Sequence, residues 1–186
     1  MTNTLNRFYL IVFIILVSNI MYGQSGNNRG ATGVKEFRAS VVKVNITPDD
    51  SQYLLGYSAR KSTGVNDSIY HRIVAFDDGT TQFFLISTEI CIVSPAEYDR
   101  VAAKIKSQLG ISPMNLWWST THTHSAPECG KAGLDKIFMG ERYQHEVDSV
   151  YTDFAEQKLI DGIKKAREQL SSARLGVGWG FSQANI

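Results

Sequence analysis

The stretch Trp117-Trp118-Ser119-Thr120-Thr121-His122-Thr123-His124-Ser125-Ala126-Pro127 is the most informative part of the chain. It reads as a hydrophobic strand that runs directly into a His-x-His pair and is then stopped by Ser-Ala-Pro. Because side chains alternate between the two faces of a strand, residues two positions apart point the same way. We therefore expect His122 and His124 to direct both imidazoles into one small volume.

This histidine pair is the first candidate for a functional site. Two neutral imidazoles a few ångströms apart are the usual beginning of a site for zinc or another transition metal. The alternative is a pair of histidines that bond only to backbone groups or water. The chain has four histidines, and finding two of them at this spacing where a strand ends favours the metal site.

The elements before the pair predict a parallel sheet. Ser94-Pro95-Ala96-Glu97 supplies an N-cap, a proline at the first helical position and a glutamate two positions later, which is the start of a capped helix ending at Gly110. A strand over 81–86, this helix and a strand over 115–120 form a βαβ unit of about 40 residues with parallel strands. His122 and His124 then fall at the carboxyl end of a parallel strand, where open α/β sheets bind ligands. Glu89-Ile90-Cys91, at the end of the neighbouring strand, should open onto the same edge.

The other elements complete the fold class. A strand over 37–46, a hairpin of strands 69–76 and 81–86 joined by Asp78-Gly79, a long ordered loop over 51–67, a helix over 143–170 and a strand over 175–179 are predicted. The second helix is expected to bury Val147, Val150, Phe154, Leu159, Ile163 and Ala166. The sequence thus predicts an α/β fold, a mixed sheet with a parallel βαβ unit flanked by helices.

Composition and the N-terminus limit where the protein works. Hydrophobic residues make up 43%, charged residues 20%, and the net charge is +1, an ordinary globular composition without the basic footprint of a nucleic-acid partner. We expect residues 1–24 to be a cleaved signal peptide, because the apolar run 8–17 is too short to span a bilayer comfortably; an uncleaved anchor is the alternative. Residues 25–36 read as a flexible leader, and 37–186 as the folded part of a secreted or periplasmic protein.

Four further residues carry weaker expectations. Cys91 and Cys129 are the only cysteines; export permits one bridge between them, and two thiols are equally consistent with the sequence. Neither is assigned to a metal, because no C-x-x-C spacing accompanies them. His71 is expected at the surface or at a strand edge, and Glu89 is a candidate partner for a histidine N–H.

Several segments, taken in order, resemble the N-terminal domain of the neutral/alkaline non-lysosomal ceramidase family. Residues 121–127 match its Thr-His-Thr-His-Ser-Gly-Pro signature, and 42–48 look like its opening strand and turn. Leu55-Gly56-Tyr57, the strand 70–76 and Asn185-Ile186 add weaker matches. The resemblance covers nearly all of 37–186.

The resemblance implies a zinc-dependent amidase that cleaves the N-acyl bond of ceramide to sphingosine and a fatty acid. It makes His122 a zinc ligand and His124 a catalytic residue beside the metal, in contact with the reacting amide or its oxyanion. The family's other zinc ligands, a later His, a Glu and a Tyr, would fall beyond Ile186. We therefore expect residues 37–186 to be the incomplete N-terminal part of a larger catalytic domain. With one confident ligand, residues 1–186 are expected to be inactive alone.

The expected partner is a small amphiphilic lipid resembling ceramide, with no nucleic acid and with contact to a membrane surface only through the substrate. Departures from the family concern the mouth of the site: Ala126 stands where the family has Gly, and Glu128-Cys129-Gly130 replaces a Gly-rich, aromatic continuation. Two alternatives remain. One is another secreted metallohydrolase, and the other is a truncated, non-catalytic homologue that keeps the fold.

Overall fold

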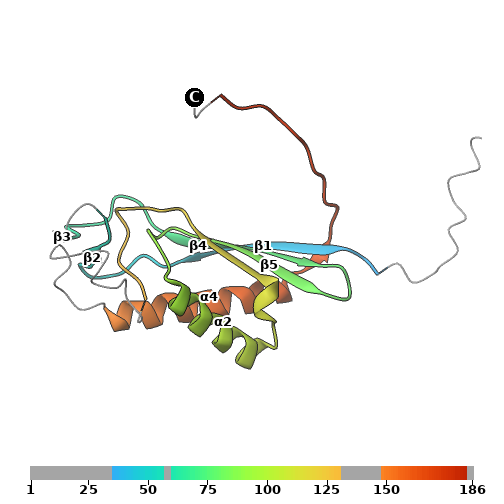
Figure 1. The fold of residues 1–186 in the computed structure, drawn as a ribbon, viewed down its shortest axis with the longest axis horizontal. Coiled ribbons are helices and arrows are strands. Elements are labelled where there is room, and N and C mark those ends of the chain that lie inside the picture. The colour runs from blue at the N-terminus through green and yellow to red at the C-terminus, as the bar shows by residue number, and fades with distance from the viewer. Residues whose placement is uncertain (1–34, 57–59, 131–147, 184–186) are drawn as a thin grey trace, which may run out of the picture. The chain divides into compact units, whose positions relative to one another are not determined.

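The computed structural model describes residues 35–56, 60–130 and 148–183. The predicted signal peptide, most of the predicted leader, Tyr57, Val147 and Asn185-Ile186 lie outside the described residues. A five-stranded sheet has the order β6-β5-β4-β1-β7, and a two-stranded sheet pairs β2 with β3 (Figure 1). The strands are β1 (Arg38–Asn45), β2 (Tyr53–Leu54), β3 (Arg60–Lys61), β4 (Tyr70–Asp77), β5 (Gln82–Thr88), β6 (Leu116–Thr120) and β7 (Ser171–Ser172). The helices are α2 (Pro95–Leu109), the 3-10 helix η1 (Pro113–Asn115) and α4 (Ser149–Glu168).

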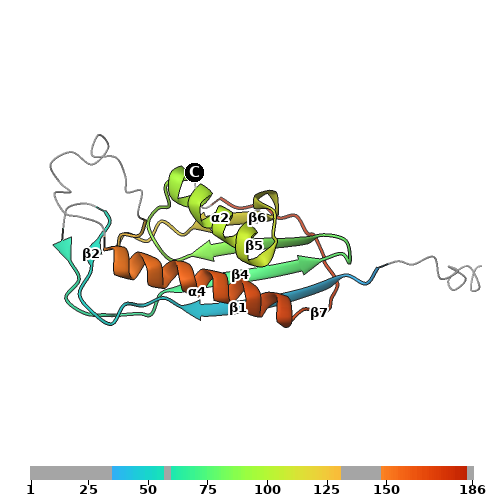
Figure 2. The same ribbon diagram turned by 90° about the horizontal axis from the view of Figure 1, so that it is seen from below.

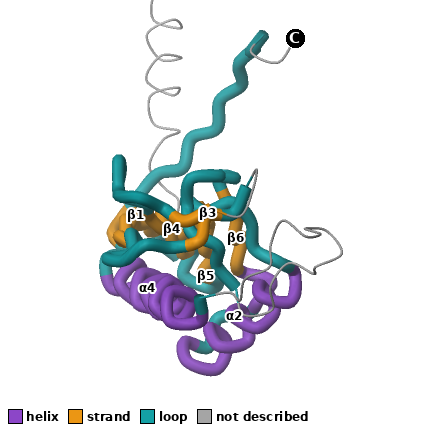
Figure 3. The backbone as a smooth tube through the Cα atoms, turned by 90° about the vertical axis from the view of Figure 1, so that its left-hand side faces the viewer, coloured by secondary structure: helices purple, strands orange, loops and turns teal. Residues whose placement is uncertain are grey.

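The five-stranded sheet is mixed, as predicted. β5 and β6 are parallel and are connected through α2. β1 pairs antiparallel with β4, and β4 pairs antiparallel with β5. Both helices lie on the same face of the sheet (Figures 2 and 3). The α/β fold class and the βαβ unit are therefore confirmed. The predicted long loop over 51–67 is partly wrong, since it contains the short β2–β3 pair.

The turn between β4 and β5 forms where the Asp-Gly signal predicts it. The Asp78 carboxylate accepts the backbone N–H groups of Thr80 at 2.8 Å and Thr81 at 2.7 Å. Gly79 has a φ of 78°, a conformation that only glycine adopts without cost. The hairpin is thus determined by local side-chain chemistry, and it sets the register of the two central strands.

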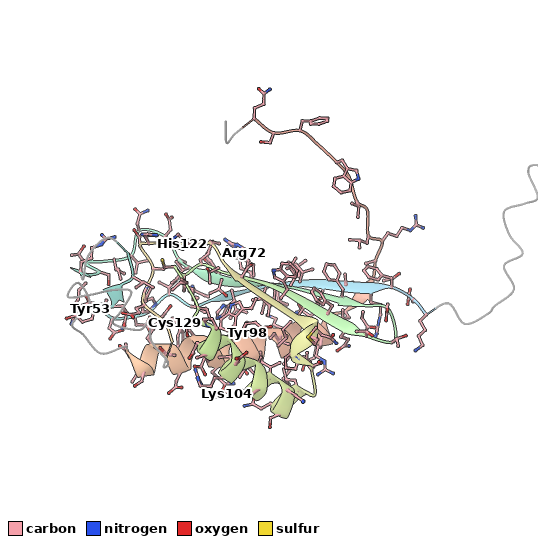
Figure 4. The ribbon with its side chains drawn as sticks, viewed as in Figure 1. Tyr53, Arg72, Tyr98, Lys104, His122 and Cys129 are labelled. Carbon is pink, nitrogen blue, oxygen red and sulfur yellow. The ribbon has the colours of Figure 1, made fainter. Side chains whose placement is uncertain are left out.

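Helix α2 begins and ends with the predicted caps. The Ser94 hydroxyl accepts the Glu97 backbone N–H, and Gly110 closes the helix in the left-handed conformation with a φ of 69°. The Glu97 side chain is 1% exposed and pairs with Arg100, which also pairs with Glu156 of α4. The ammonium of Lys104 lies 2.6 Å from the same Glu156 carboxylate. This cluster of charges joins the two helices; Figure 4 labels Lys104, its member on α2.

Helix α4 packs closely on β1 and β4. A Cβ at Gly162 would lie 2.6 Å from Ile73 Cδ1 and 2.8 Å from Val44 Cγ2, so a hydrogen atom at this position lets the helix approach the sheet. The buried stripe of the helix includes Tyr151, Ala155, Leu159, Ile163 and Ala166. Val150 and Phe154, predicted to be buried, are 78% and 38% exposed. The prediction was wrong for these two residues, because the first buried residue of the helix is Tyr151 and not Val150.

The opposite face of the sheet carries a row of aligned apolar residues. Val41, Val74, Leu85 and Trp117 are paired in register across β1, β4, β5 and β6. Trp117 is 63% exposed, whereas Trp118 on the other face packs against the core. One tryptophan of the pair thus lies in the core, as strand alternation requires.

Two further observations concern segments outside the sheet. The predicted strand over 175–179 is wrong: β7 covers only two residues, and Leu175, Val177 and Trp179 are exposed. No helix in the described ranges combines the length and the apolar character needed to cross a bilayer.

Candidate metal centre

The parallel pairing of β5 and β6 brings two loops to one edge of the sheet. Thr88 pairs with Thr120 at the carboxyl ends of the two strands. Backbone hydrogen bonds continue beyond the strands, from Thr121 N–H to Thr88 O at 3.0 Å and from Thr123 N–H to Ile90 O at 3.2 Å. Residues 89–91 and 121–123 therefore run side by side, as predicted for this edge of the sheet.

His122 has an unusual backbone conformation. Its φ of 59° is the only positive value at a non-glycine residue in the part of the chain that the structure describes. A left-handed conformation costs a residue with a Cβ about 1–2 kcal/mol. Such strain is retained where the surrounding structure imposes it, which is typical of functional sites.

The two histidine rings meet, although not for the predicted reason. β6 ends at Thr120, so His122 and His124 lie in the loop after the strand, where strand alternation does not apply. Their ring centroids are nevertheless 4.6 Å apart, with the ring planes at 75°. The predicted convergence of both imidazoles in one volume is confirmed, and the left-handed turn at His122 accompanies it.

Two groups of Cys91 lie close to the His122 ring. Its carbonyl oxygen lies 3.0 Å from His122 Nδ1, and its Sγ lies 3.7 Å from the same nitrogen. Because a carbonyl oxygen only accepts hydrogen bonds, a neutral His122 ring in contact with it carries its proton on Nδ1. The Cys91 carbonyl also accepts the Thr120 hydroxyl at 3.1 Å.

Three side chains at this edge can hold a metal ion together. Donor atoms of Cys91, His122 and His124, one from each residue, all lie within 4.8 Å of one another. Thiolate and imidazole are the donors that zinc and related transition metals prefer. The sequence assigns neither cysteine to a metal for lack of a C-x-x-C spacing, whereas the structure brings the Cys91 thiol beside the two histidines. The available signal was the position of Cys91 at the end of the neighbouring parallel strand.

The two cysteines differ in their surroundings. Both are free thiols in the structure. Burial raises the pKa of Cys91. Burial, reinforced by the Glu97 carboxylate, raises the pKa of Cys129 to about 12. Cys129 packs at the edge of a small core cluster with Ile46, Ile90 and Ala126, so it serves as an internal control for experiments on Cys91.

The loop that follows the histidines is hydrogen-bonded to β2. Pro127 forms a bridge with Leu54, and the Glu128 N–H donates to Tyr53 O at 2.9 Å. Ala126, which stands where the family signature has Gly, is fully buried. Gly130 N–H donates to Thr152 Oγ1 of α4 at 3.2 Å. The loop is thereby anchored on both sides of the site.

Gly56 packs directly against His124. A Cβ at Gly56 would lie 2.7 Å from His124 Nδ1 and 3.0 Å from His124 Cβ, and the φ of 154° also disfavours a side chain. Gly56→Ala is therefore expected to displace the His124 ring and to destabilise the fold by about 1–3 kcal/mol, the usual cost of overpacking. In two-dimensional NMR spectra, the cross-relaxation between His122 and His124 ring protons should disappear.

Gly64→Ala is the matched control for this variant, because a Cβ at Gly64 meets nothing within 4 Å. The control should keep both the ring contact and the thermal midpoint of the parent chain. An unchanged ring contact in Gly56→Ala would show that Gly56 does not position His124.

Two residues near the edge have structural partners. Glu89 Oε1 pairs with Arg72 at 2.6 Å, while the buried Oε2 atom has no hydrogen-bond partner among the described residues, so the bond to a histidine N–H stays a prediction. Figure 4 labels Arg72 and His122 at this end of the strands. His71, predicted at the surface, is 1% exposed. Its Nδ1 lies 2.7 Å from Thr88 Oγ1 and its Nε2 lies 2.9 Å from Ala155 O, and burial lowers its pKa to about 4.

A cleft of about 860 Å³ lies against the histidine loop. Thr123 and Ser125, which flank His124 in the sequence, form part of its wall. The rest of the lining is mixed: it has apolar side chains such as Leu54 and Ile69, cations from Arg60 and Lys61, and carboxylates from Asp49, Asp50 and Asp67. A cleft with apolar and charged portions suits an amphiphilic ligand.

The comparisons with known proteins concern the fold. No family model and no curated protein matches the chain. Among solved structures, the neutral ceramidase from Pseudomonas aeruginosa matches with a TM-score of 0.62 and 19% identity over 74% of this chain. A structure described as ceramidase complexed with C2 matches with a TM-score of 0.60, also at 19% identity and over 74% of this chain. The chain spans 22% of the length of each solved chain. Residues of this chain therefore adopt the fold of a part of neutral ceramidase.

Proposed function

We propose that this chain supplies the histidine half of a zinc-dependent amide hydrolase that cleaves the N-acyl bond of ceramide-like lipids. His122 is the metal ligand, and His124 is the catalytic residue that contacts the reacting amide or its oxyanion. The predicted signal peptide over residues 1–24 supports a location of this reaction outside the cytoplasm, in the periplasm or the medium.

One observation carries the proposal. Two imidazoles and a thiol converge at the carboxyl ends of adjacent parallel strands, in a fold shared with part of neutral ceramidase. The donor set fits zinc, because imidazole nitrogen and thiolate sulfur are its common protein ligands. The left-handed backbone of His122 supports a functional role, since residues held in such conformations cluster at active sites and ligand clamps.

The chemistry of amide cleavage explains why these groups are needed together. His122 would hold a zinc ion there, which would supply Lewis-acid chemistry to the poorly electrophilic carbonyl and would lower the pKa of a water molecule toward about 7. His124, with its ring edge against His122, is placed to donate a hydrogen bond to a developing oxyanion or a proton to the departing amine. The adjoining cleft, with its apolar and polar walls, accommodates the amphiphilic substrate beside these groups.

The test is hydrolysis of a ceramide with a fluorescent acyl chain by the complete encoded protein, loaded with zinc. We expect release of the labelled fatty acid, loss of the reaction with a chelator, and recovery on adding zinc. His124→Ala should lower kcat by about 100-fold or more, the usual cost of losing an oxyanion donor, with an unchanged zinc content. Residues 1–186 by themselves are expected to show no turnover.

Two outcomes would contradict the proposal. One is a zinc-loaded complete protein that leaves the ceramide intact while hydrolysing other esters or phosphoesters. The other is a His124→Ala protein with the parent's kcat, which would remove His124 from the reaction.

A further inference from the structure

We infer that the Cys91 thiolate is a ligand of the same metal ion as His122. This inference rests on the proposed function, because it requires a metal at His122. The resemblance to ceramidases gives Cys91 no role; the inference comes from the geometry of the β5 and β6 loops. It gives the described part of the chain a sulfur–nitrogen ligand pair, with His124 left to face the substrate.

The separation of the two donor atoms fits a common ion. Zinc binds sulfur at about 2.3 Å and imidazole nitrogen at about 2.0–2.1 Å, so two such ligands at a tetrahedral angle lie about 3.6 Å apart. Cys91 Sγ and His122 Nδ1 are 3.7 Å apart. The side chains are therefore already spaced as the edge of a tetrahedral site, before any ion draws them together.

The Cys91 carbonyl oxygen lies on the same side of the His122 ring, 3.0 Å from Nδ1. An ion that replaces the Nδ1 proton would lie within about 2.1 Å of this oxygen, so the carbonyl becomes a further ligand or turns aside when the ion binds. The oxygen would keep a hydrogen-bond donor, because the Thr120 hydroxyl lies 3.1 Å from it. The exchange thus leaves no buried carbonyl without a partner, which would otherwise cost about 1–3 kcal/mol.

The scaffold holds Cys91 against the histidine loop. Thr123 N–H donates to Ile90 O, and Thr121 N–H donates to Thr88 O. These bonds fix the backbone on both sides of His122 to the residues that precede Cys91. Cys91 is 5% exposed, so its sulfur lies at the base of the site while the exposed His122 ring forms the outer side.

Substitutions of Cys91 can distinguish the effect of its sulfur on metal binding from that of its backbone carbonyl. Cys91→Ser and Cys91→Ala remove the thiol and keep the backbone oxygen. If Cys91 acts only through its carbonyl, both variants bind the metal like the parent. If the sulfur is a ligand, the affinity falls by more than about 100-fold, the upper limit for losing a partner that merely orients a ligand.

The experiment uses the purified chain, kept reduced and titrated with cobalt(II) and with zinc. In the parent chain and in Cys129→Ser, cobalt should give a near-ultraviolet sulfur-to-cobalt charge-transfer band. In Cys91→Ser the band should be absent and the zinc affinity reduced. Cys129→Ser is the matched control, because it removes the other thiol, whose pKa burial raises to about 12.

A measurement on the parent chain avoids any dependence on the folding of the variants. X-ray absorption at the zinc edge should show one sulfur at about 2.3 Å together with nitrogen or oxygen at about 2.0–2.1 Å. A zinc shell of nitrogen and oxygen alone, with binding lost in His122→Ala and kept in Cys91→Ser, would overturn this inference and leave the proposed function intact. Absence of zinc and cobalt binding in the parent chain would also overturn this inference, whereas hydrolysis of ceramide tests the proposed function separately.

Discussion

Replacing His122 with alanine is expected to abolish stoichiometric zinc binding by this chain. The imidazole is the outer ligand of the proposed site, and its ring is held beside Cys91 and His124. Losing a ligand should weaken zinc affinity by more than about 100-fold, beyond the effect of losing a group that only orients a ligand. Competition with a chromophoric chelator measures the change. Thr121→Ala, in the same loop, should bind zinc like the parent, because its hydroxyl contacts Thr123 at 2.6 Å and not a donor atom.

The variant His122→Gly is a second test of the role of His122 in zinc binding, because residue 122 has a left-handed backbone. Glycine adopts the left-handed conformation without the steric cost that a Cβ brings. A larger unfolded-state entropy offsets part of this gain. The metal-free His122→Gly chain should therefore be as stable as the parent or more stable by up to about 1 kcal/mol, while its zinc binding is lost. A His122→Gly chain that unfolds more easily without metal would show that the His122 ring serves the fold and not the site.

Acid is expected to destabilise the metal-free fold through His71. Burial lowers the pKa of His71 from 6.5 to about 4, and the neutral ring is held between Thr88 and Ala155. Between these two pH values the unfolded chain binds a proton that the folded chain excludes. The free energy of unfolding should therefore fall by about 3 kcal/mol as the pH decreases from 6.5 to 4, at 1.36 kcal/mol per pKa unit.

Urea unfolding of the metal-free chain at several pH values measures this dependence. His71→Gln is the matched variant, because an amide can donate to the Ala155 carbonyl and accept from Thr88 without titrating in this range. The variant should lose most of the decrease between pH 6.5 and 4. An equally steep decrease in His71→Gln would assign the acid sensitivity to other groups.

Local chemistry in the sequence accounts for much of the fold. The caps Ser94 and Gly110 and the turn at Asp78-Gly79 act within a few residues of themselves, so their signals are visible in the sequence and are confirmed. The parallel pairing of β5 and β6 followed from the helix between them. The burial of His71 could not be predicted, because it depends on the carbonyl of Ala155, 84 positions away.

In the candidate site, too, local features could be predicted from the sequence and contacts between distant segments could not. The sequence indicated that His122 and His124 converge, but it assumed a continuing strand where the structure has a left-handed turn. Cys91 was set aside for lack of a C-x-x-C spacing, although its distance from His122 is determined by strand pairing and not by sequence spacing. Tertiary pairing between parallel strands therefore defines this site, and a motif within one segment captures only part of it.

The most direct test of the account is an anomalous-scattering map, recorded at the zinc absorption edge, from crystals of the chain grown with zinc. The account predicts a peak about 2.0–2.1 Å from a His122 nitrogen, at the shared edge of β5 and β6. A peak at any other place on the chain, or a map without one at His122, would contradict it.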